Sequence, residues 1–400
     1  MIPATFAVTT KAVRMRLTPR ELIGRAQDLA PALASRAGRT EANKGLLDEN
    51  LRDLIDSGVL ATLTPAVYGG HEAPIATMVS ITQVLSAACP STGWVAAFYM
   101  GAAWRLLSFS PTAQREIFAD KPYVLSAGQA APLREVTREP GGYRISGQTP
   151  WSSGAVHAEW INFMGALIED GVPQPITFIV PRAETTLVPH WDVAGMRGTG
   201  SHDMRVENVF VPDYRAASLQ ETLEGRTPGQ ALHANRQYQL PFIPFLMCEV
   251  VPVLVGGLRG AAEAFVARVQ ARAGTISGVK AASTQAAQMR LARGLAAADA
   301  AETLMSAYVE RYSAGLPTRN TLEERAQMKL KAAFMTDLCR NAVNDLARGF
   351  GGDGFRDESP LQRYFRDLNM LAVHAFLDID TAAETYGRMV LGLPLEDRMV

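Results

Sequence analysis

The stretch GGYRISGQTPW (141–151) marks the point at which the texture of the sequence changes. A Gly-Gly turn is followed by alternation that predicts Tyr143, Ile145 and Trp151 on one face of a strand. Three further short runs are rich in β-branched and aromatic residues and lie between turn residues: WINFMGAL, ITFIVP and MRVENVFVP. Several strands at this spacing predict a small β-barrel or sandwich over about 122–215.

Helical periodicity flanks this β segment on both sides. The segment 75–104 is almost uncharged, so its helices should be buried on most sides. After a connection that contains Gly and Pro (216–240), helical periodicity resumes and predicts four long helices, which suit a bundle and oligomerisation. We therefore expect a mainly α chain of the α+β class, with domains over 1–121, 122–232 and 233–400.

Composition excludes several classes of function. The formal net charge of −1 over 400 residues predicts no attraction to nucleic acid or to anionic lipid. The most apolar segment (245–258) contains Glu249, Pro252 and a Gly pair, and we expect it to be too short to span a membrane. Three widely spaced cysteines form neither a zinc pattern nor a disulfide framework, which favours a reducing cytoplasm.

Two motifs near the β segment are candidates for ligand binding. In PWSSG (150–154), Trp151 and Ser153 are two residues apart and would face the same way on an extended strand. An indole beside a hydroxyl suits a planar ring with a hydrogen-bonding edge, although a core tryptophan with a strand-end serine is the alternative. GMRGTGS (195–201) precedes a strand and not a helix, so we expect a tight turn and no dinucleotide fingerprint.

The C-terminal part holds three more candidates. YFRDLNMLAVHAF (364–376) reads as an amphipathic helix whose mixed flank carries Met370 and His374, where a histidine is more often structural than catalytic. GFGGDGF (349–355) is a connector or a place where backbone approaches a ligand closely. Arg272 could pair with a phosphate or be a solvated helix-end arginine. The histidines show no metal-ligand spacing, so no metal site is predicted.

Taken in order, these motifs resemble the acyl-CoA dehydrogenase superfamily, and within it the oxygenase components of two-component flavin-dependent monooxygenases, such as 4-hydroxyphenylacetate 3-hydroxylase and dibenzothiophene monooxygenase. The resemblance runs from YGG (68–70) to RYFRDLNMLAVH (363–374). It implies an N-terminal helical domain, a central β-barrel or sandwich and a C-terminal four-helix bundle, assembled as a homotetramer. It also implies that reduced FMN or FAD, delivered by a separate NAD(P)H-flavin reductase, binds between the β-domain and the bundle.

The resemblance further implies roles for individual residues. Trp151 matches the tryptophan beside the isoalloxazine ring, and Ser153 matches the hydroxyl residue at flavin N5. His374 matches the active-site histidine of the monooxygenases, and Arg272 lies where an arginine reaches the flavin phosphate of the adjacent subunit. The other implied cofactor residues are Ser126, Gln129, Gly351 and Gly352, and the implied substrate residues are Trp94, Phe98, Trp191 and Met370.

One departure from the dehydrogenase pattern selects the branch. Acyl-CoA dehydrogenases commonly carry Tyr-Glu-Gly-Thr after an Arg-Asp pair, whereas Arg366-Asp367 leads here to VHAFLD, without the carboxylate base. The resemblance thus implies hydroxylation of a small phenol- or indole-like substrate by O₂ through a flavin hydroperoxide. His374 would remove a substrate proton or hydrogen-bond the peroxide. A flavin-dependent acyl-CoA dehydrogenase and a flavin-free helical scaffold are the alternatives.

Overall fold

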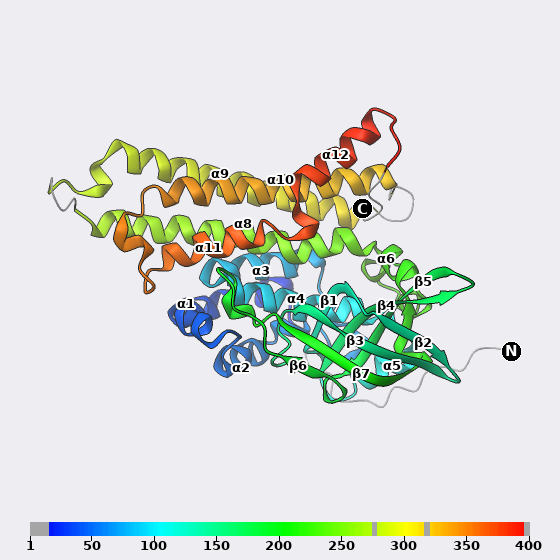
Figure 1. The fold of residues 1–400 in the computed structure, drawn as a ribbon. Helices are drawn as coiled ribbons and strands as arrows, with labels where there is room; N and C mark the ends of the chain where they lie inside the picture. Colours follow the sequence, from blue (N-terminus) through cyan, green and yellow to red (C-terminus); the bar gives the residue numbers. More distant parts are fainter. Residues whose placement is uncertain (1–15, 274–277, 316–320, 396–400) are drawn as a thin grey trace.

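The chain has three parts in the order helical, β, helical (Figure 1). The computed structural model describes residues 16–273, 278–315 and 321–395. The N-terminal helices and the β-domain lie side by side beneath the long C-terminal helices. This arrangement confirms the predicted fold class.

The N-terminal part is helical, and it includes one long amphipathic helix and one nearly uncharged helix. They are α1 (Pro19–Asn43), α2 (Asp48–Ser57), α3 (Ile75–Ala88), α4 (Pro90–Leu106) and α5 (Pro111–Ile117), with 3₁₀ turns at Val59–Ala61 and Ala66–Tyr68. Thr18 and Glu21 form a capping box that fixes the start of α1. Helix α4 is buried along almost its whole length, as its composition predicts, and it carries Trp94 into the centre of the molecule.

The β-domain is a sandwich of two four-stranded sheets. One sheet has the order β1 (Ser126–Pro132), β4 (Trp160–Glu169), β5 (Val172–Pro181), β8 (Ala216–Ser218). The other has the order β2 (Glu135–Glu139), β3 (Gly142–Ser152), β7 (His202–Pro212), β6 (Thr186–Val188). Ile145, Phe163 and Phe178 are fully buried in a core of their own, so the expected sandwich is present.

The strict alternation predicted for β3 does not reach Trp151. Pairing of β3 with β7 shifts register between Ile145 and Gly147 and again between Thr149 and Ser152. Trp151 has a φ of 67° and a side chain that is 70 % exposed. Because such irregularities re-aim the side chains that follow them, Trp151 does not share the buried face of Ile145.

Within residues 233–273, 278–315 and 321–395, the C-terminal part contains three long helices and two short ones, so the prediction of four long helices is wrong. The helices are α8 (Phe242–Ala271), α9 (Gln285–Ala314), α10 (Leu322–Ala347), α11 (Pro360–Leu371) and α12 (Ile379–Val390). Before them, α6 (Leu219–Glu224), α7 (Pro228–Ala231) and a 3₁₀ turn (Arg236–Gln239) occupy the predicted connection. Helix α11 completes the bundle against α8 and α10, while α12 packs near the start of α10 and projects from the bundle (Figure 1). The remaining 3₁₀ turns are Arg182–Glu184, Arg197–Thr199, Asp213–Arg215, Ala281–Ser283, Gly352–Phe355 and Ala375–Leu377.

Helix α8 corrects the expectation of a short, interrupted apolar segment. It continues through Glu249, Pro252 and the Gly pair, and by length and composition it could cross a membrane. However, 89 % of its most apolar window is buried inside the protein, as in the core helix of a globular domain. Its buried Glu249 pairs with Arg105 of α4, which offsets the desolvation of a charge in this core.

The segment 364–376 is not one continuous helix. Helix α11 ends at Leu371, and His374 lies in the following loop, where its ring accepts the N–H of Phe376. Asp378 then caps α12 by accepting the N–H of Thr381. His374 and Asp378, which cap the Ala375–Leu377 turn and α12, lie four residues apart. The chain therefore does not continue the path of α11, and His374 lies outside the helix.

Candidate active site

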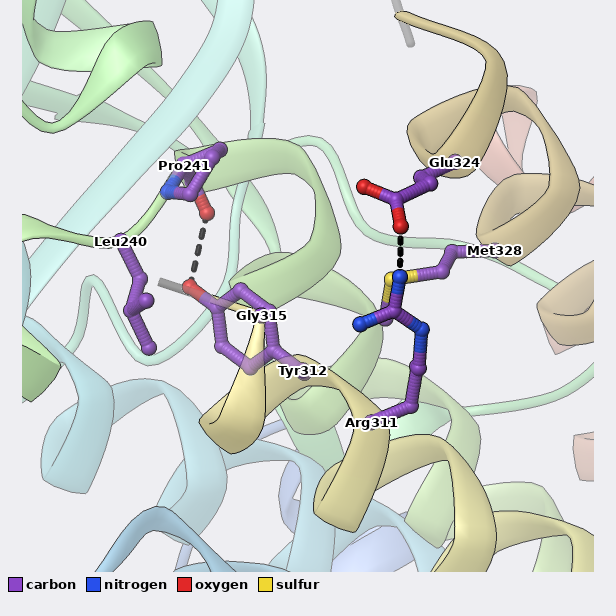
Figure 2. Close-up of a pocket in the computed structure, with 7 residues that line it drawn as sticks. All are labelled: Leu240, Pro241, Arg311, Tyr312, Gly315, Glu324 and Met328. Carbon is purple, nitrogen blue, oxygen red and sulfur yellow. Dashed lines mark hydrogen bonds and ion pairs between the residues drawn. The ribbon is translucent and has the colours of Figure 1, made fainter. Parts of the chain in front are cut away.

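A small pocket near the end of α9 is not the site. There the Tyr312 hydroxyl donates to the Pro241 carbonyl (2.8 Å), and Arg311 pairs with Glu324 (Figure 2). Its cavity volume is about 10 Å³, which is room for roughly one water molecule. None of the residues predicted for flavin or substrate lines this pocket.

The structure brings His374 together with two predicted substrate residues. The rings of Trp94 and His374 lie edge to face, with centroids 5.8 Å apart and planes at 64°. Phe98, one turn further along α4, packs against Trp94 with centroids 4.9 Å apart. A loop after α11 and a buried helix of the N-terminal domain therefore build one aromatic cluster.

His374 is neutral near neutral pH and has a defined tautomer. Burial lowers the pKa of His374 to about 4, because the imidazolium would lose its hydration there. The Nδ1 atom accepts the backbone N–H of Phe376 at 3.4 Å. The single proton of the neutral ring consequently resides on Nε2, so His374 presents a hydrogen-bond donor to the site.

Ser153 also contacts Trp94 and belongs to a run of hydroxyl groups. The indole Nε1 of Trp94 donates to Ser153 Oγ at 2.9 Å. Ser153 Oγ lies 2.7 Å from Ser201 Oγ, and Ser201 Oγ lies 2.7 Å from Thr199 Oγ1. Thr199 Oγ1 then donates to the Met196 carbonyl at 2.9 Å. We call Ser153, Ser201 and Thr199 the hydroxyl relay.

The sequence prediction missed two members of this relay. The 195–201 segment is a turn before β7, as expected, but its Thr199 and Ser201 are buried and face Ser153. Two hydroxyl residues spaced by one glycine were the available signal. That signal has no meaning without the fold, because Ser153 is distant in the sequence.

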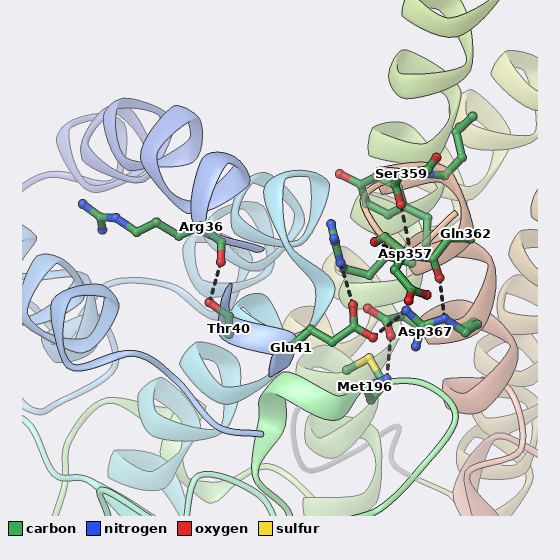
Figure 3. A network of polar contacts seen from close by, with 12 residues as sticks. Arg36, Thr40, Glu41, Met196, Asp357, Ser359, Gln362 and Asp367 are labelled. Atoms are coloured by element: carbon green, nitrogen blue, oxygen red, sulfur yellow. Dashed lines mark hydrogen bonds and ion pairs between the residues drawn. The ribbon is translucent and has the colours of Figure 1, made fainter. Parts of the chain in front are cut away.

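The relay loop is anchored on α11 through Met196. Met196 has a φ of 52°, and its N–H donates to the buried Asp367 carboxylate at 2.5 Å. Figure 3 shows Asp367 beside Met196, with Glu41 and Gln362 nearby. The Trp191 indole donates to the Met196 carbonyl at 3.2 Å, so its N–H is used inside this loop, and its substrate role stays a prediction.

The anchor gives the fold a distinctive pH dependence. Burial raises the pKa of Asp367 to about 7, so the stability it contributes is fully present below its ordinary pKa and is lost as the pH rises through about 7. Asp367→Asn stays neutral. Between about pH 5 and about pH 8, its free energy of unfolding should therefore fall by about 2 kcal/mol less than that of wild type. Urea titrations at both pH values measure the free energy of unfolding, and Asp380→Asn at an exposed position is the control. The same change in this free energy between the two pH values in both variants would contradict the prediction.

Residues of β1 lie next to the end of β3. Ser152 Oγ donates to Gln129 Oε1 at 2.7 Å, which joins the two strands below the relay. Gln129 Nε2 is buried without a partner among the described residues, and such an orphaned donor fits a ligand acceptor. Ser126 is buried at the start of β1. With the exposed Trp151 indole, these groups offer a flat surface and polar atoms to a planar ring.

Arg272 and Gly351 form a second cluster, at the end of α8. Arg272 Nη1 donates to the Phe350 carbonyl at 3.4 Å. Gly351 has a φ of 64°, and a Cβ atom added there would lie 2.1 Å from Arg272 Nη1. Because the contacted atom ends a flexible side chain, it is the backbone, with a ψ of 172° at this positive φ, that favours glycine here. Beside Gly352, by contrast, the space is open.

A surface pocket adjoins this second cluster. It has a volume of about 430 Å³, which is within the range of small-molecule sites. Arg268 and Arg356 line it together with Asp353 and Glu358, and Asp353 forms ion pairs with both arginines. Among the described residues, no group of His, Cys, Asp or Glu side chains could hold a metal ion.

Comparisons with known proteins find relatives along nearly the whole chain. The family described as acyl-CoA dehydrogenase, C-terminal domain, matches residues 249–379. A pigment production hydroxylase of Rhodococcus sp. (strain ATCC 21145) is 57 % identical over 96 % of this chain and 100 % of its own length. The oxygenase subunit HsaA of a flavin-dependent monooxygenase of Rhodococcus jostii (strain RHA1) is 31 % identical over 93 % of this chain and 98 % of its own. The structure of XiaF from Streptomyces sp. with FADH2 and glycerol superposes with a TM-score of 0.87, at 27 % identity, over 96 % of this chain and 98 % of its own.

The chain belongs to the flavin-dependent monooxygenase oxygenase components that have the acyl-CoA dehydrogenase fold. It is an oxidoreductase that depends on flavin. This confirms the predicted family and enzyme class, and it favours the monooxygenase over the acyl-CoA dehydrogenase alternative.

Proposed function

We propose that this protein hydroxylates a small phenol- or indole-like compound with O₂, using reduced flavin from a separate NAD(P)H-flavin reductase. The observation that carries the proposal is the cluster of His374, Trp94 and Ser153, which the three parts of the chain contribute jointly. The oxygenase-subunit relative supports the need for a separate reductase. The aromatic walls supplied by Trp94 and Phe98 support an aromatic substrate.

The residues present fit a flavin ring. When bound, reduced flavin supplies the activation of O₂ and the oxygen atom that is transferred. Ser153 has a lone pair free for N5, Gln129 has an unused donor, and the exposed Trp151 indole can cover the ring. The buried, nearly uncharged α4 keeps water from this side of the site.

His374 acts in this proposal as a neutral hydrogen-bond donor through Nε2. Its low pKa and the Phe376 N–H on Nδ1 support donation to the reacting oxygen over removal of a substrate proton. Met370 and Trp191 complete the proposed substrate residues. Met370 is partly buried on α11, three residues after Asp367.

We further propose that the cofactor is FAD and that the protein is a homotetramer. The Arg272 guanidinium beside the Gly351 backbone offers positive charge to a dinucleotide phosphate, and the adjoining pocket offers room for it. No described contact joins this cluster to the relay, which supports its use by the flavin of a neighbouring subunit. The FADH2 bound to XiaF favours FAD. Three buried free cysteines support a cytoplasmic location.

Arg272→Ala should weaken binding of reduced FAD about tenfold to a hundredfold, because a charge-assisted phosphate contact is lost. Reduced FMN, which lacks the adenylate, should bind more weakly than reduced FAD to the wild type. Anaerobic fluorescence titration measures both affinities, with Arg39→Ala on the exposed face of α1 as the control. An unchanged FAD affinity in Arg272→Ala would remove this residue from the cofactor site.

The proposed function is tested by coupling the protein to an NADH-flavin reductase with a panel of phenols and indoles. Mass spectrometry should find a product heavier by one oxygen for at least one compound. If an acyl thioester reduces the bound flavin anaerobically and no aromatic compound is hydroxylated, the dehydrogenase alternative is correct.

A further inference from the structure

The two ends of the hydroxyl relay have fixed hydrogen-bond polarity. At one end, the Trp94 indole N–H can only donate, so Ser153 Oγ accepts from it. At the other end, the Met196 carbonyl oxygen can only accept, so the Thr199 hydroxyl at 2.9 Å donates to it, beside the N–H groups of the Trp191 indole and the Thr199 backbone. All three hydroxyl groups between these ends are at hydrogen-bond distance from their neighbours.

Counting protons then orients every bond of the relay. Thr199 donates its only hydroxyl proton to the Met196 carbonyl, so it must accept the hydrogen bond that it shares with Ser201. Ser201 therefore has no proton for Ser153, and Ser153 must donate to Ser201. Ser153 Oγ thus accepts from Trp94, donates to Ser201 and keeps one lone pair. Any other order would leave two oxygen lone pairs facing each other in a buried site.

We propose that Ser201 and Thr199 are positioning residues that leave Ser153 able only to accept a hydrogen bond from flavin N5, so that the site selects reduced over oxidised flavin. This inference rests on the proposed function, in which Ser153 contacts flavin N5. Reduced flavin carries a proton at N5 and donates, whereas N5 of oxidised flavin is an acceptor. Because the Ser153 proton is already donated to Ser201, Ser153 can only accept from flavin N5, which matches the reduced form and repels the oxidised one.

The selection suits the direction of the reaction. The cofactor arrives reduced from another protein and must leave oxidised after each turnover. Because the fold fixes the direction of the hydrogen bonds in the relay, the site favours the arrival of reduced flavin and the release of oxidised flavin without any movement of the backbone. Asp367 contributes indirectly, because it holds the Met196 peptide that terminates the relay.

Ser201→Ala tests the proposal through the affinity for both redox states of FAD. The variant removes the acceptor of the Ser153 proton, which becomes free to donate to oxidised N5. The ratio of the dissociation constants for oxidised and reduced FAD should fall about tenfold. Spectroelectrochemical titration should correspondingly find the potential of bound FAD about 30 mV more negative than in wild type.

Two substitutions at Thr199 separate polarity from simple structural damage. Thr199→Val keeps the side-chain shape but frees the Ser201 proton, so it should lower the ratio in the same direction. Thr199→Ser keeps the hydroxyl and should leave the ratio at the wild-type value. Ser108→Ala is the matched control, because the Ser108 hydroxyl is equally buried but, within the described part of the chain, donates to the Arg105 carbonyl and not to the relay.

The outcomes distinguish this inference from the function on which it rests. If wild type fails to bind reduced FAD, the proposed function fails and this inference with it. If wild type binds reduced FAD and hydroxylates, but Ser201→Ala and Thr199→Val keep the wild-type ratio, the relay does not set the polarity of Ser153. A lowered ratio in both variants, with wild-type ratios in Thr199→Ser and Ser108→Ala, supports it.

Discussion

Replacing His374 with alanine should lower substrate hydroxylation by about 10²- to 10⁴-fold while reduced flavin still binds. The imidazole packs against Trp94 and, among the described residues, shares no hydrogen bond with Gln129, Ser152 or Ser153, so its loss removes a reactive donor and leaves the groups proposed for the flavin ring in place. Single-turnover assays with quantified product, beside anaerobic flavin titrations, measure the two effects separately. Unchanged product formation would exclude His374 from the mechanism.

A second substitution at this position separates the two chemical roles. His374→Gln retains an N–H donor near the position of Nε2 but cannot act as a base, so it should recover part of the lost activity. A variant as inactive as His374→Ala would favour proton removal instead. Because the pKa of His374 is about 4, the wild-type rate should not show a His374 titration at or above neutral pH.

Ser153→Ala should divert most of the consumed O₂ to hydrogen peroxide, with peroxide release faster by about tenfold to a hundredfold. The substitution removes the group proposed to hold the N5 proton and leaves the Trp94 N–H and Ser201 without their partner. The measurement compares hydrogen peroxide with hydroxylated product at equal flavin oxidation.

The control for this experiment is another serine on the same strand. Ser146 of β3 accepts the N–H of Asn208 at 2.9 Å and has no contact with the relay, so Ser146→Ala should couple as wild type does. If Ser153→Ala also couples as wild type does, the assignment of Ser153 to N5 is wrong.

The sequence was sufficient for the order of the parts and the sandwich because these depend on local periodicity. Alternation of side chains predicted the β-domain, and the lack of charge around Trp94 predicted a buried helix. Alternation failed at Trp151, because register shifts between β3 and β7 depend on a partner strand that is distant in sequence. The end of α11 was missed because the 364–376 spacing remains helical past Leu371.

The candidate site was predictable only in part. His374, Ser153 and Arg272 could be proposed from motifs, but their neighbours arise from tertiary contacts. Nothing local in the sequence indicates that Thr199 faces Ser201 and Ser153, or that Asp367 holds Met196. Buried polar groups of this kind are identified by their partners, which only the fold supplies.

The most direct test of the central claim is a single turnover with ¹⁸O₂. The protein is loaded anaerobically with reduced FAD, mixed with an aromatic substrate identified from the panel, and pulsed with ¹⁸O₂. The account predicts one ¹⁸O atom in the hydroxylated product of wild type, and almost none in His374→Ala, whose FAD is nonetheless oxidised. Product that carries oxygen from water, or flavin oxidation without any labelled product in wild type, would contradict it.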